Sequence, residues 1–435
     1  MNTLEKTESL AFNNVSEDQG SPSEKEDIFP QIQRARPIPR ISIQAFCEAQ
    51  STADTLQNTA EDRRLAKAHM HVQMGGLEAA LAFYKGATTP NLIVLETHKK
   101  EDELLENLDM LADVCDSGTK VLIIGPTNDI ILYRELLRRG VSEYLVLPLK
   151  PIDIMESISN LYNDPETDPV GSVIAFIGAK GGVGSSTVCH NTAWLISEAI
   201  KTDVVIADMD LPFGTAGLDF NQDPVQGILD ALSAPERLDE MLLDRLLSKC
   251  SEHLSLFSAP ATLEQEYDID AEACETVIDI TRSNIPYVLV DLPHTWTSWT
   301  KKILMQADEI VITAIPDLAN LRNTKNLIDV LKNGRDNDRD PWLVFNQVNM
   351  PKRPEISVKD ISKAIGIDSA ITIDFDSELF GMATNNGQMI EEISKKSKAS
   401  ESFRELAFLL THRTDNETEN SKSLLAPFLK RFGVL

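Results

Sequence analysis

Residues 172–200 have the sequence SVIAFIGAKGGVGSSTVCHNTAWLISEAI, and this stretch decides the fold. It opens with an apolar run at 173–177, which is short enough to form a buried strand of a parallel sheet. A glycine-rich turn follows, and a helical pattern of apolar and small residues then continues to Ala199. Glycines let the backbone approach phosphate groups, and the free N–H groups of a first helical turn point at them. The stretch therefore predicts a phosphate-binding loop between a strand and a helix.

This loop departs from the ordinary P-loop pattern, which places a lysine directly after its last glycine. Ser185 stands at that position here, and Ala179 stands where the pattern has its first glycine. A lysine occurs earlier instead, at Lys180, and Ser186 occupies the position whose hydroxyl would hold Mg²⁺. A glycine-rich turn that binds nothing is the alternative. The residues that we predict to bind nucleotide in this loop are Lys180, Gly181, Gly182, Val183, Gly184, Ser185, Ser186 and Thr187.

Carboxylates follow two further predicted strands. The segment VVIADMDL places Asp208 and Asp210 at a strand's carboxyl end, where ligands bind in open α/β sheets. The segment YVLVDLP has four apolar residues before Asp291, a pattern typical of a Walker B strand, whose acid holds the hydration shell of Mg²⁺. We therefore assign Ser186 and Asp291 to a Mg²⁺ site, and a family resemblance implies Asp208 as its third member. Strand-end acids without a role are the alternative for the first pair.

The composition restricts the classes of partner and the compartment. The 435 residues are enough for two or three domains, and their net charge of −27 argues against bulk attraction to nucleic acid, although a local basic patch stays open. The five cysteines include no Cys-x-x-Cys pair, as expected of thiols in a reducing cytosol. The acidic, polar N-terminus is no secretory signal, and no apolar run approaches the roughly 18 to 20 residues that span a bilayer. We expect a cytoplasmic protein.

Changes in composition divide the chain into five parts. Residues 1–40 are polar and lack an apolar period, so we expect a disordered tail. Residues 41–162 form a first α/β domain, and the polar, proline-bracketed segment 163–170 is a linker. Residues 171–412 form the domain with the phosphate-binding loop, and residues 413–435 form a flexible tail with a short amphipathic segment.

The first domain alternates predicted strands and helices, which indicates a parallel sheet covered on both faces. The range 63–70 is predicted to be one of its helices. The phrase LLRRGVSEYLVLPLKP resembles the last strand region of response-regulator receiver domains, which are flavodoxin-like. A working receiver also needs an acidic pair, an aspartate, a hydroxyl and a lysine to hold Mg²⁺ and the phosphoryl group.

Each of these chemical positions departs from the receiver pattern. The first strand is followed by Glu48 with no acidic pair, Glu96 replaces the aspartate, Gly125 ends the fourth strand, and Leu147 stands at the lysine position. We interpret the domain as a degenerate receiver used for protein contacts. Glu96 is either an imitation of a phosphorylated aspartate or an incidental surface acid.

The second domain resembles the MinD/ParA ATPases, because its Lys-Gly-Gly-x-Gly core after a buried strand is similar to their deviant Walker A motif. This resemblance implies a P-loop NTPase fold with a mostly parallel sheet. It also implies that Lys180 reaches across a nucleotide-sandwich dimer to the phosphates held by the other copy. By the same resemblance Asp208 positions the attacking water near Mg²⁺, which makes Lys180 and Asp208 the catalytic candidates, and Asp210 belongs to switch I.

Two residues near the C-terminal end of this domain are candidates for the nucleoside. The segment WLVFNQVN ends a predicted strand at Asn346, and the resemblance implies that such an asparagine recognises adenine with its side-chain amide. A turn asparagine is the alternative. Asp376 follows the last predicted strand, in the loop that closes over the base in the MinD/ParA family.

A degenerate receiver placed before GAKGGVGSST resembles the CpaE/TadZ proteins of Flp (Tad) pilus assembly. The resemblance implies a cytoplasmic and often polar protein that binds ATP and Mg²⁺, forms a homodimer and recruits the pilus secretion ATPase and other assembly components. Hydrolysis is expected to be weak or partner-dependent, because Ser185 cannot supply the charge of the P-loop lysine. The alternatives are an ordinary ParA/MinD-type ATPase that positions another cargo and a scaffold that does not hydrolyse ATP.

The tail segment LLAPFLKRFGVL places apolar residues on one side of a helix and Lys430 and Arg431 on the other. Such a segment can lie in a membrane interface. One expectation is therefore a weak membrane contact at the inner-membrane face. The other is that the tail packs on its own domain or on a protein partner.

Overall fold

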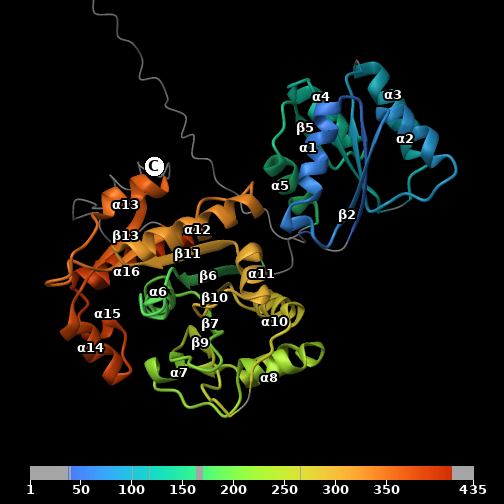
Figure 1. The fold of residues 1–435 in the computed structure, drawn as a ribbon. Helices are drawn as coiled ribbons and strands as arrows, with labels where there is room; N and C mark the ends of the chain where they lie inside the picture. The colour runs from blue at the N-terminus through green and yellow to red at the C-terminus, as the bar shows by residue number, and fades with distance from the viewer. Residues whose placement is uncertain are drawn as a thin grey trace, which may run out of the picture. The chain divides into compact units, whose positions relative to one another are not determined.

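The computed structural model describes residues 38, 41–99, 101–116, 118–162, 170–264 and 266–413. These residues form two separate α/β units, each built on its own sheet (Figure 1). The predictions made for most of the N-terminal tail, for most of the linker and for the C-terminal amphipathic segment lie outside the described residues. Ile38 is described, and it is buried in the core of the first unit, so the prediction of a disordered tail up to residue 40 is wrong at this residue. The structure confirms the predicted fold class, α/β with mostly parallel sheets.

The first unit has a five-stranded parallel sheet in the order β2-β1-β3-β4-β5, which is the flavodoxin-like order. Helices α1 and α5 pack on one face of the sheet, and helices α2, α3 and α4 pack on the other. The strands are β1 Ser42–Cys47, β2 His69–Met74, β3 Leu92–Glu96, β4 Lys120–Gly125 and β5 Glu143–Val146. The helices are α1 Gln50–Ala60, α2 Gly76–Tyr84, α3 Glu101–Ala112, α4 Ile130–Arg138 and α5 Pro151–Tyr162.

The helix predicted over residues 63–70 is wrong. The structure has one 3-10 turn at Arg63–Leu65, and the edge strand β2 then begins at His69 and pairs with β1 along its whole length. The strand alternates His69, Met70, His71 and Val72, a period of two that a helix cannot use. Helix α1 has no strong sequence signal, because its buried positions are mostly threonine and alanine.

The second unit has an eight-stranded sheet in the order β13-β12-β11-β6-β10-β7-β9-β8. Only β8 among its described strands runs antiparallel to its neighbour. The strands are β6 Ser172–Gly178, β7 Val204–Asp208, β8 Ser248–Lys249, β9 Leu254–Phe257, β10 Tyr287–Asp291, β11 Glu309–Ala314, β12 Trp342–Val348 and β13 Ser369–Asp374. Every residue of β6 is buried, as expected of a central strand with β10 on one side and β11 on the other.

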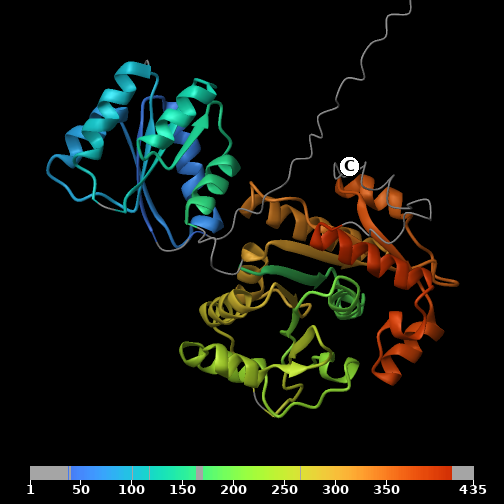
Figure 2. The same cartoon turned by 180° about the vertical axis from the view of Figure 1, so that it is seen from behind.

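Helices cover both faces of this sheet. The main core lies on one face, under α8, α10, α11, α12 and α13, and on the other face α6 and α16 lie side by side (Figure 2). The helices are α6 Ser185–Ala199, α7 Ala216–Asp219, α8 Ile228–Ser233, α9 Glu240–Leu246, α10 Ala271–Asn284, α11 Ser298–Gln306, α12 Leu318–Gly334, α13 Val358–Ile365, α14 Ser377–Asn386, α15 Ile390–Ile393 and α16 Lys398–Thr411. None of the described helices is both long enough and apolar enough to cross a bilayer.

The topology fixes where a ligand can bind in the second unit. The chain leaves β6 for β7, two places away in one direction, and β11 lies on the other side of β6. Ligands of open α/β sheets bind at the carboxyl ends of strands where the connections diverge in this way. The glycine-rich loop begins at that end of β6.

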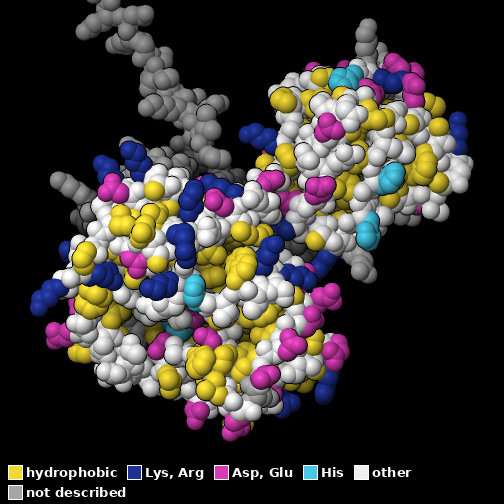
Figure 3. Space-filling view, viewed as in Figure 1, with side chains coloured by type: hydrophobic (Ala, Val, Ile, Leu, Met, Phe, Trp, Pro, Cys, Tyr) yellow, Lys and Arg dark blue, Asp and Glu magenta, His cyan; other side chains and the backbone are white. Residues whose placement is uncertain are grey.

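The face seen in Figure 3 carries basic and acidic side chains with apolar side chains between them.

Candidate nucleotide-binding site

The glycine-rich loop spans residues 179–184, and helix α6 begins at Ser185. Gly182 and Gly184 have left-handed φ angles of 79° and 85°, which L side chains rarely adopt. A Cβ on Gly184 would also lie 2.5 Å from the side-chain nitrogen of Asn346. Glycine is therefore required at position 184 both by its backbone angle and by the close approach of another strand.

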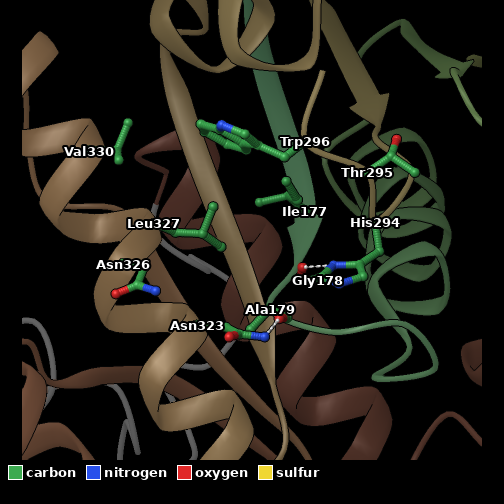
Figure 4. A pocket seen from close by; sticks show the side chains of 10 residues that line it. All are labelled: Ile177, Gly178, Ala179, His294, Thr295, Trp296, Asn323, Asn326, Leu327 and Val330. Atoms are coloured by element: carbon green, nitrogen blue, oxygen red, sulfur yellow. Dashed lines mark hydrogen bonds between the residues drawn. The ribbon is translucent and has the colours of Figure 1, made fainter. Parts of the chain in front are cut away.

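Four side chains from other segments hold the carbonyl groups of Gly178, just before the loop, and of three loop residues. Each donates to one carbonyl oxygen: His294 Nδ1 to Gly178 (3.0 Å), Asn323 Nδ2 to Ala179 (2.8 Å), Gln347 Nε2 to Gly182 (3.1 Å) and Asn346 Nδ2 to Val183 (2.8 Å). Figure 4 shows the first two of these bonds, beside a cavity of about 300 Å³ that Trp296 also lines. A carbonyl oxygen held in this way does not turn toward a bound anion. The groups that the loop can present to an anion are therefore its N–H groups.

The two strand-end acids lie next to each other. Asp208 of β7 and Asp291 of β10 are partners in the sheet register, and both are buried. Asp208 accepts bonds from the backbone N–H groups of Asp210 (3.1 Å) and Ala216 (3.3 Å), which ties the loop after β7 to the site. Burial and the neighbouring Asp291 carboxylate raise the pKa of Asp208. Oδ1 of Asp291 is buried and has no hydrogen-bond partner among the described atoms.

His190 of α6 belongs to the same cluster, although no sequence pattern points to it. Its side chain is 0% exposed, with Nδ1 2.8 Å from Oδ2 of Asp219 and Nε2 3.4 Å from Oδ2 of Asp291. Burial alone would lower the pKa of His190, but the two carboxylates outweigh it and raise that pKa to about 10. A single histidine inside an amphipathic helix gives no signal of this kind in the sequence, because its partners come from α7 and β10.

The residues present fit Mg²⁺ only together with phosphate groups. Among the described residues, no group of three or more His, Cys, Asp or Glu side chains is arranged to hold a metal ion. Ser186 lies in the first turn of α6, and two buried oxygens, Ser185 Oγ in the same turn and Asp291 Oδ1 at the end of β10, lack partners among the described residues. Mg²⁺ commonly keeps several waters and binds one or two protein oxygens plus phosphate oxygens. That donor set matches what Ser186 and the two acids offer.

A second cavity, of about 400 Å³, brings together the residues predicted to bind the nucleoside. Both Asn346 and Asp376 line it, on β12 and at the start of α14. Its further lining residues are Gly184, Thr187, Gln347, Asp374, Phe375, Ser377, Phe380, Gly381, Thr384 and Asn385. Oδ1 of Asn346 also accepts from the Gln347 N–H at 2.8 Å, and Oδ1 of Asp376 caps α14 through the Leu379 N–H at 2.9 Å. The capping bonds use Oδ1 of Asp376, so its second carboxylate oxygen remains an acceptor for a ligand.

Lys180 lies at the exposed edge of the loop. Its charge reaches Asp317, the N-cap of α12: partial burial works against ionisation there, but the bonds from Asn320 and the charge of Lys180 lower the pKa of Asp317. Lys180 makes no ion pair with another residue in the described part of the chain. Its ammonium group therefore remains available at the surface of the site.

In the first unit, the interpretation of Glu96 as an incidental surface acid is wrong. The side chain is 1% exposed and accepts hydrogen bonds from the backbone N–H groups of Glu48 (2.7 Å) and Ala49 (2.8 Å) and from the hydroxyl of Thr52 (2.7 Å). These donors belong to the N-terminal end of α1, so the Glu96 carboxylate, at the end of strand β3, caps that helix. The sequence could not indicate this, because α1 itself was not predicted.

Comparison with known proteins supports the resemblance to the MinD/ParA ATPases and the resemblance to the CpaE proteins. A family model described as an AAA domain matches residues 171–341. The crystal structure of a ParA family ATPase from Chlorobium tepidum TLS is similar, with 27% sequence identity and a TM-score of 0.51, over 55% of this chain and 99% of that one. The septum site-determining protein MinD of Synechocystis sp. is 24% identical over 247 residues, which are 54% of this chain and 87% of that protein.

A third similar protein is the pilus assembly protein CpaE from Caulobacter crescentus CB15, whose structure has been solved. It is 50% identical, over 30% of this chain and 98% of that one. The TM-score is 0.29, so the relationship rests on the sequence identity and not on the superposition. Since half of the aligned residues are identical over almost the whole of that structure, this chain belongs to the CpaE family of pilus assembly proteins, and its second unit is similar to the ATPase domains of the MinD/ParA type.

Proposed function

We propose that this chain binds ATP with Mg²⁺, dimerises when ATP is bound, and acts as a localisation and assembly factor of the Flp (Tad) pilus machinery. The observation that carries the proposal is the loop at 179–184: side chains hold the carbonyl groups of Ala179, Gly182 and Val183, and that of Gly178 just before the loop, while the N–H groups from Lys180 onward are left for phosphate. Adjacent to it lie a buried pair of acids and a cavity large enough for a nucleoside. These features support nucleotide binding more directly than they support a bare scaffold.

Each predicted residue has a role in this proposal. The N–H groups of residues 180–186 bind the phosphates, and the Ser186 hydroxyl and, through water, Asp291 hold Mg²⁺. Mg²⁺ would neutralise charge on the phosphate oxygens. Asp208 orients the attacking water, and Lys180 of each copy reaches the phosphates bound by the other copy. Asn346 and Asp376 recognise the nucleoside.

Hydrolysis is proposed to be weak or partner-dependent. In an ordinary P-loop a lysine meets the charge that builds on the phosphate oxygens, and Ser185 has no charge to offer. Removal of one electrostatic contact of this kind costs on the order of 10² to 10³ in rate. The Ser185 hydroxyl is buried and has no hydrogen-bond partner among the described atoms.

The test is a titration of the purified full chain with ATP in the presence of Mg²⁺, followed by a turnover assay. We expect binding with slow turnover, and we expect Ser185→Lys to raise turnover about tenfold or more. The control is His253→Asn, which removes a partly exposed His–Asp pair far from the loop in sequence (Nδ1 to Asp203 Oδ1, 2.7 Å). Failure of the unchanged chain to bind ATP would refute the proposal. Turnover by the unchanged chain that matches the Ser185→Lys variant would refute its hydrolysis part.

The partners and the location follow from the family. We propose contacts with the pilus secretion ATPase and other Tad/Flp components, a cytoplasmic location at the cell pole or the inner-membrane face, and no bulk DNA binding. The net charge of −27 is the observation behind the last point. Affinity capture of the secretion ATPase by the full chain tests the proposed contact, and the amount captured is compared between ATP and ADP. Equal capture in both nucleotides would argue against an ATP-dependent assembly factor.

A further inference from the structure

His190 lies where three elements of the second unit meet. It belongs to α6, its Nδ1 donates to Asp219 at the end of α7, and its Nε2 is 3.4 Å from Asp291 at the end of β10. The ring has no exposed surface and lies 5.7 Å from the ring of Phe220. A close-packed side chain of this kind cannot move without moving its neighbours.

The contacts continue from α7 to the nucleoside cavity. Two residues after Asp219, the side chain of Asn221 donates to the backbone carbonyls of Asn386 (3.2 Å) and Gly387 (3.0 Å). These carbonyls lie where α14 ends, and Gly387 there adopts a left-handed φ of 60°. Thr384 and Asn385, in the last turn of the same helix, line the 400 Å³ cavity. A chain of direct contacts therefore joins the acid pair to the wall of the nucleoside cavity.

Helix α6 also holds the far end of this wall. Asn191, the residue after His190, accepts a bond from the backbone N–H of Ile390 at 2.8 Å, and its Nδ2 donates to the carbonyl of Thr187 at 2.9 Å. The segment between α14 and α15 is thus fixed at two points, one from α7 and one from α6. Of these two attachments, the one through Asn221 is connected to the acid pair, because Asn221 follows α7, Asp219 of α7 contacts His190, and His190 contacts Asp291.

We propose that His190 is a positioning residue that couples the Mg²⁺ end of the site to its nucleoside end, through α7 and Asn221. The inference rests on the proposed nucleotide function. Oδ2 of Asp291 lies 3.4 Å from Nε2 of His190, and this Nε2 and Oδ1 of the same carboxylate are both buried atoms without a hydrogen-bond partner among the described residues. A ligand bound to Oδ1 turns the carboxylate, and the packed imidazole passes that change to Asp219. Coupling between two ends of a site is reciprocal, so ATP and Mg²⁺ strengthen each other's binding.

The test measures the affinity of the full chain for ATP with excess Mg²⁺ and with a chelator, and takes the ratio. His190→Asn retains a donor near Nδ1 but does not reach Asp291, Asp219→Asn weakens the bond to the ring, and Asn221→Ala removes the bonds to the end of α14. His253→Asn is the matched control, because it alters a His–Asp pair outside the cluster. Hydrogen exchange of residues 384–390, measured on ATP-bound protein before and after addition of Mg²⁺, is the readout that a merely structural role would not change.

We expect the Mg²⁺ ratio to fall about fivefold or more in His190→Asn, Asp219→Asn and Asn221→Ala, and to stay unchanged in the control. We also expect the exchange response at 384–390 to disappear in those three variants. An unchanged ratio together with an unchanged exchange response in them would overturn the inference and leave the proposed function intact. If His190→Asn fails to fold, the variants Asn221→Ala and Asp219→Asn test the inference by the same two measurements, because Asn221 is exposed and Asp219 is partly exposed. If the unchanged chain binds no ATP, the proposed function and this inference fall together.

Discussion

At the scale of single residues, the length of one side chain accounts for the arrangement at Glu96. A working receiver has an aspartate at this position, which faces solvent and the phosphoryl donor. The glutamate is one methylene longer, and its carboxylate reaches the end of α1, where two N–H groups and a hydroxyl bind it. Its three donors make Glu96 a structural cap, because a buried carboxylate needs such partners.

We predict that Glu96→Ala lowers the free energy of unfolding of the first unit by about 1 to 3 kcal/mol, since it leaves buried donors without an acceptor. Urea denaturation of the full chain, monitored through a signal from residues 41–162, measures this free energy of unfolding. The control is Glu78→Ala, which removes an exposed acid paired with Lys99 and should change stability by less than about 0.5 kcal/mol. Equal effects of the two substitutions would contradict the capping role.

Also at this scale, we predict that Gln347→Ala weakens ATP binding about fivefold, because the loss of one hydrogen bond to the Gly182 carbonyl costs about 1 kcal/mol of loop preorganisation. Titration with a fluorescent ATP analogue checks it. Gln50→Ala removes an exposed glutamine that bonds Asp54 within α1, and it serves as the control. An affinity for ATP that is the same in both variants would show that the loop does not depend on this bond.

At the scale of elements, the first unit keeps the receiver's strand order without the receiver's chemistry. The carboxyl ends of β3, β4 and β5 would carry the aspartate, the hydroxyl and the lysine, and here they carry a buried Glu96, Gly125 and the segment with Leu147. A phosphoryl group would find neither a nucleophile in solvent nor Mg²⁺ ligands there.

We therefore predict that acetyl phosphate with Mg²⁺ adds no phosphoryl group to residues 41–162 of the full chain. Mass spectrometry of peptides from this segment, after incubation, is the measurement. A receiver domain with its acids intact, treated in parallel, confirms that the reagent is active. One added phosphoryl group on a peptide that contains Glu96 would contradict the prediction.

At the scale of the whole molecule, Lys180 is an exposed cation at the edge of the candidate site. It makes no described ion pair, and it lies at the edge of a loop in which side chains of the same copy hold the carbonyl groups of Ala179, Gly182 and Val183. A lysine so placed can complete a phosphate site only in another molecule or on the outer side of its own nucleotide.

We predict that Lys180→Ala weakens ATP-dependent self-association about tenfold or more while the fold stays intact, because a charge-assisted contact to phosphate is lost. Sedimentation velocity with and without ATP is the measurement. Lys332→Ala, which removes an exposed lysine paired with Asp340, is the control. ATP-dependent dimers that persist in the Lys180 variant would assign this lysine to the nucleotide of its own copy or to none.

The sequence by itself determined the α/β class, the glycine-rich loop and the strands that end in Asp208 and Asp291, because each depends on a short local pattern. It failed at residues 63–70 and at α1, where burial of small polar side chains against other elements decides the structure. Only the tertiary structure brought His190 to Asp219 and Asp291, turned Glu96 inward, and joined Asn323 and Gln347 to the loop carbonyls. The physical reason is that hydrogen bonds between distant elements depend on how the strands are ordered and how the helices pack, and the residue spacing along the chain contains no record of either.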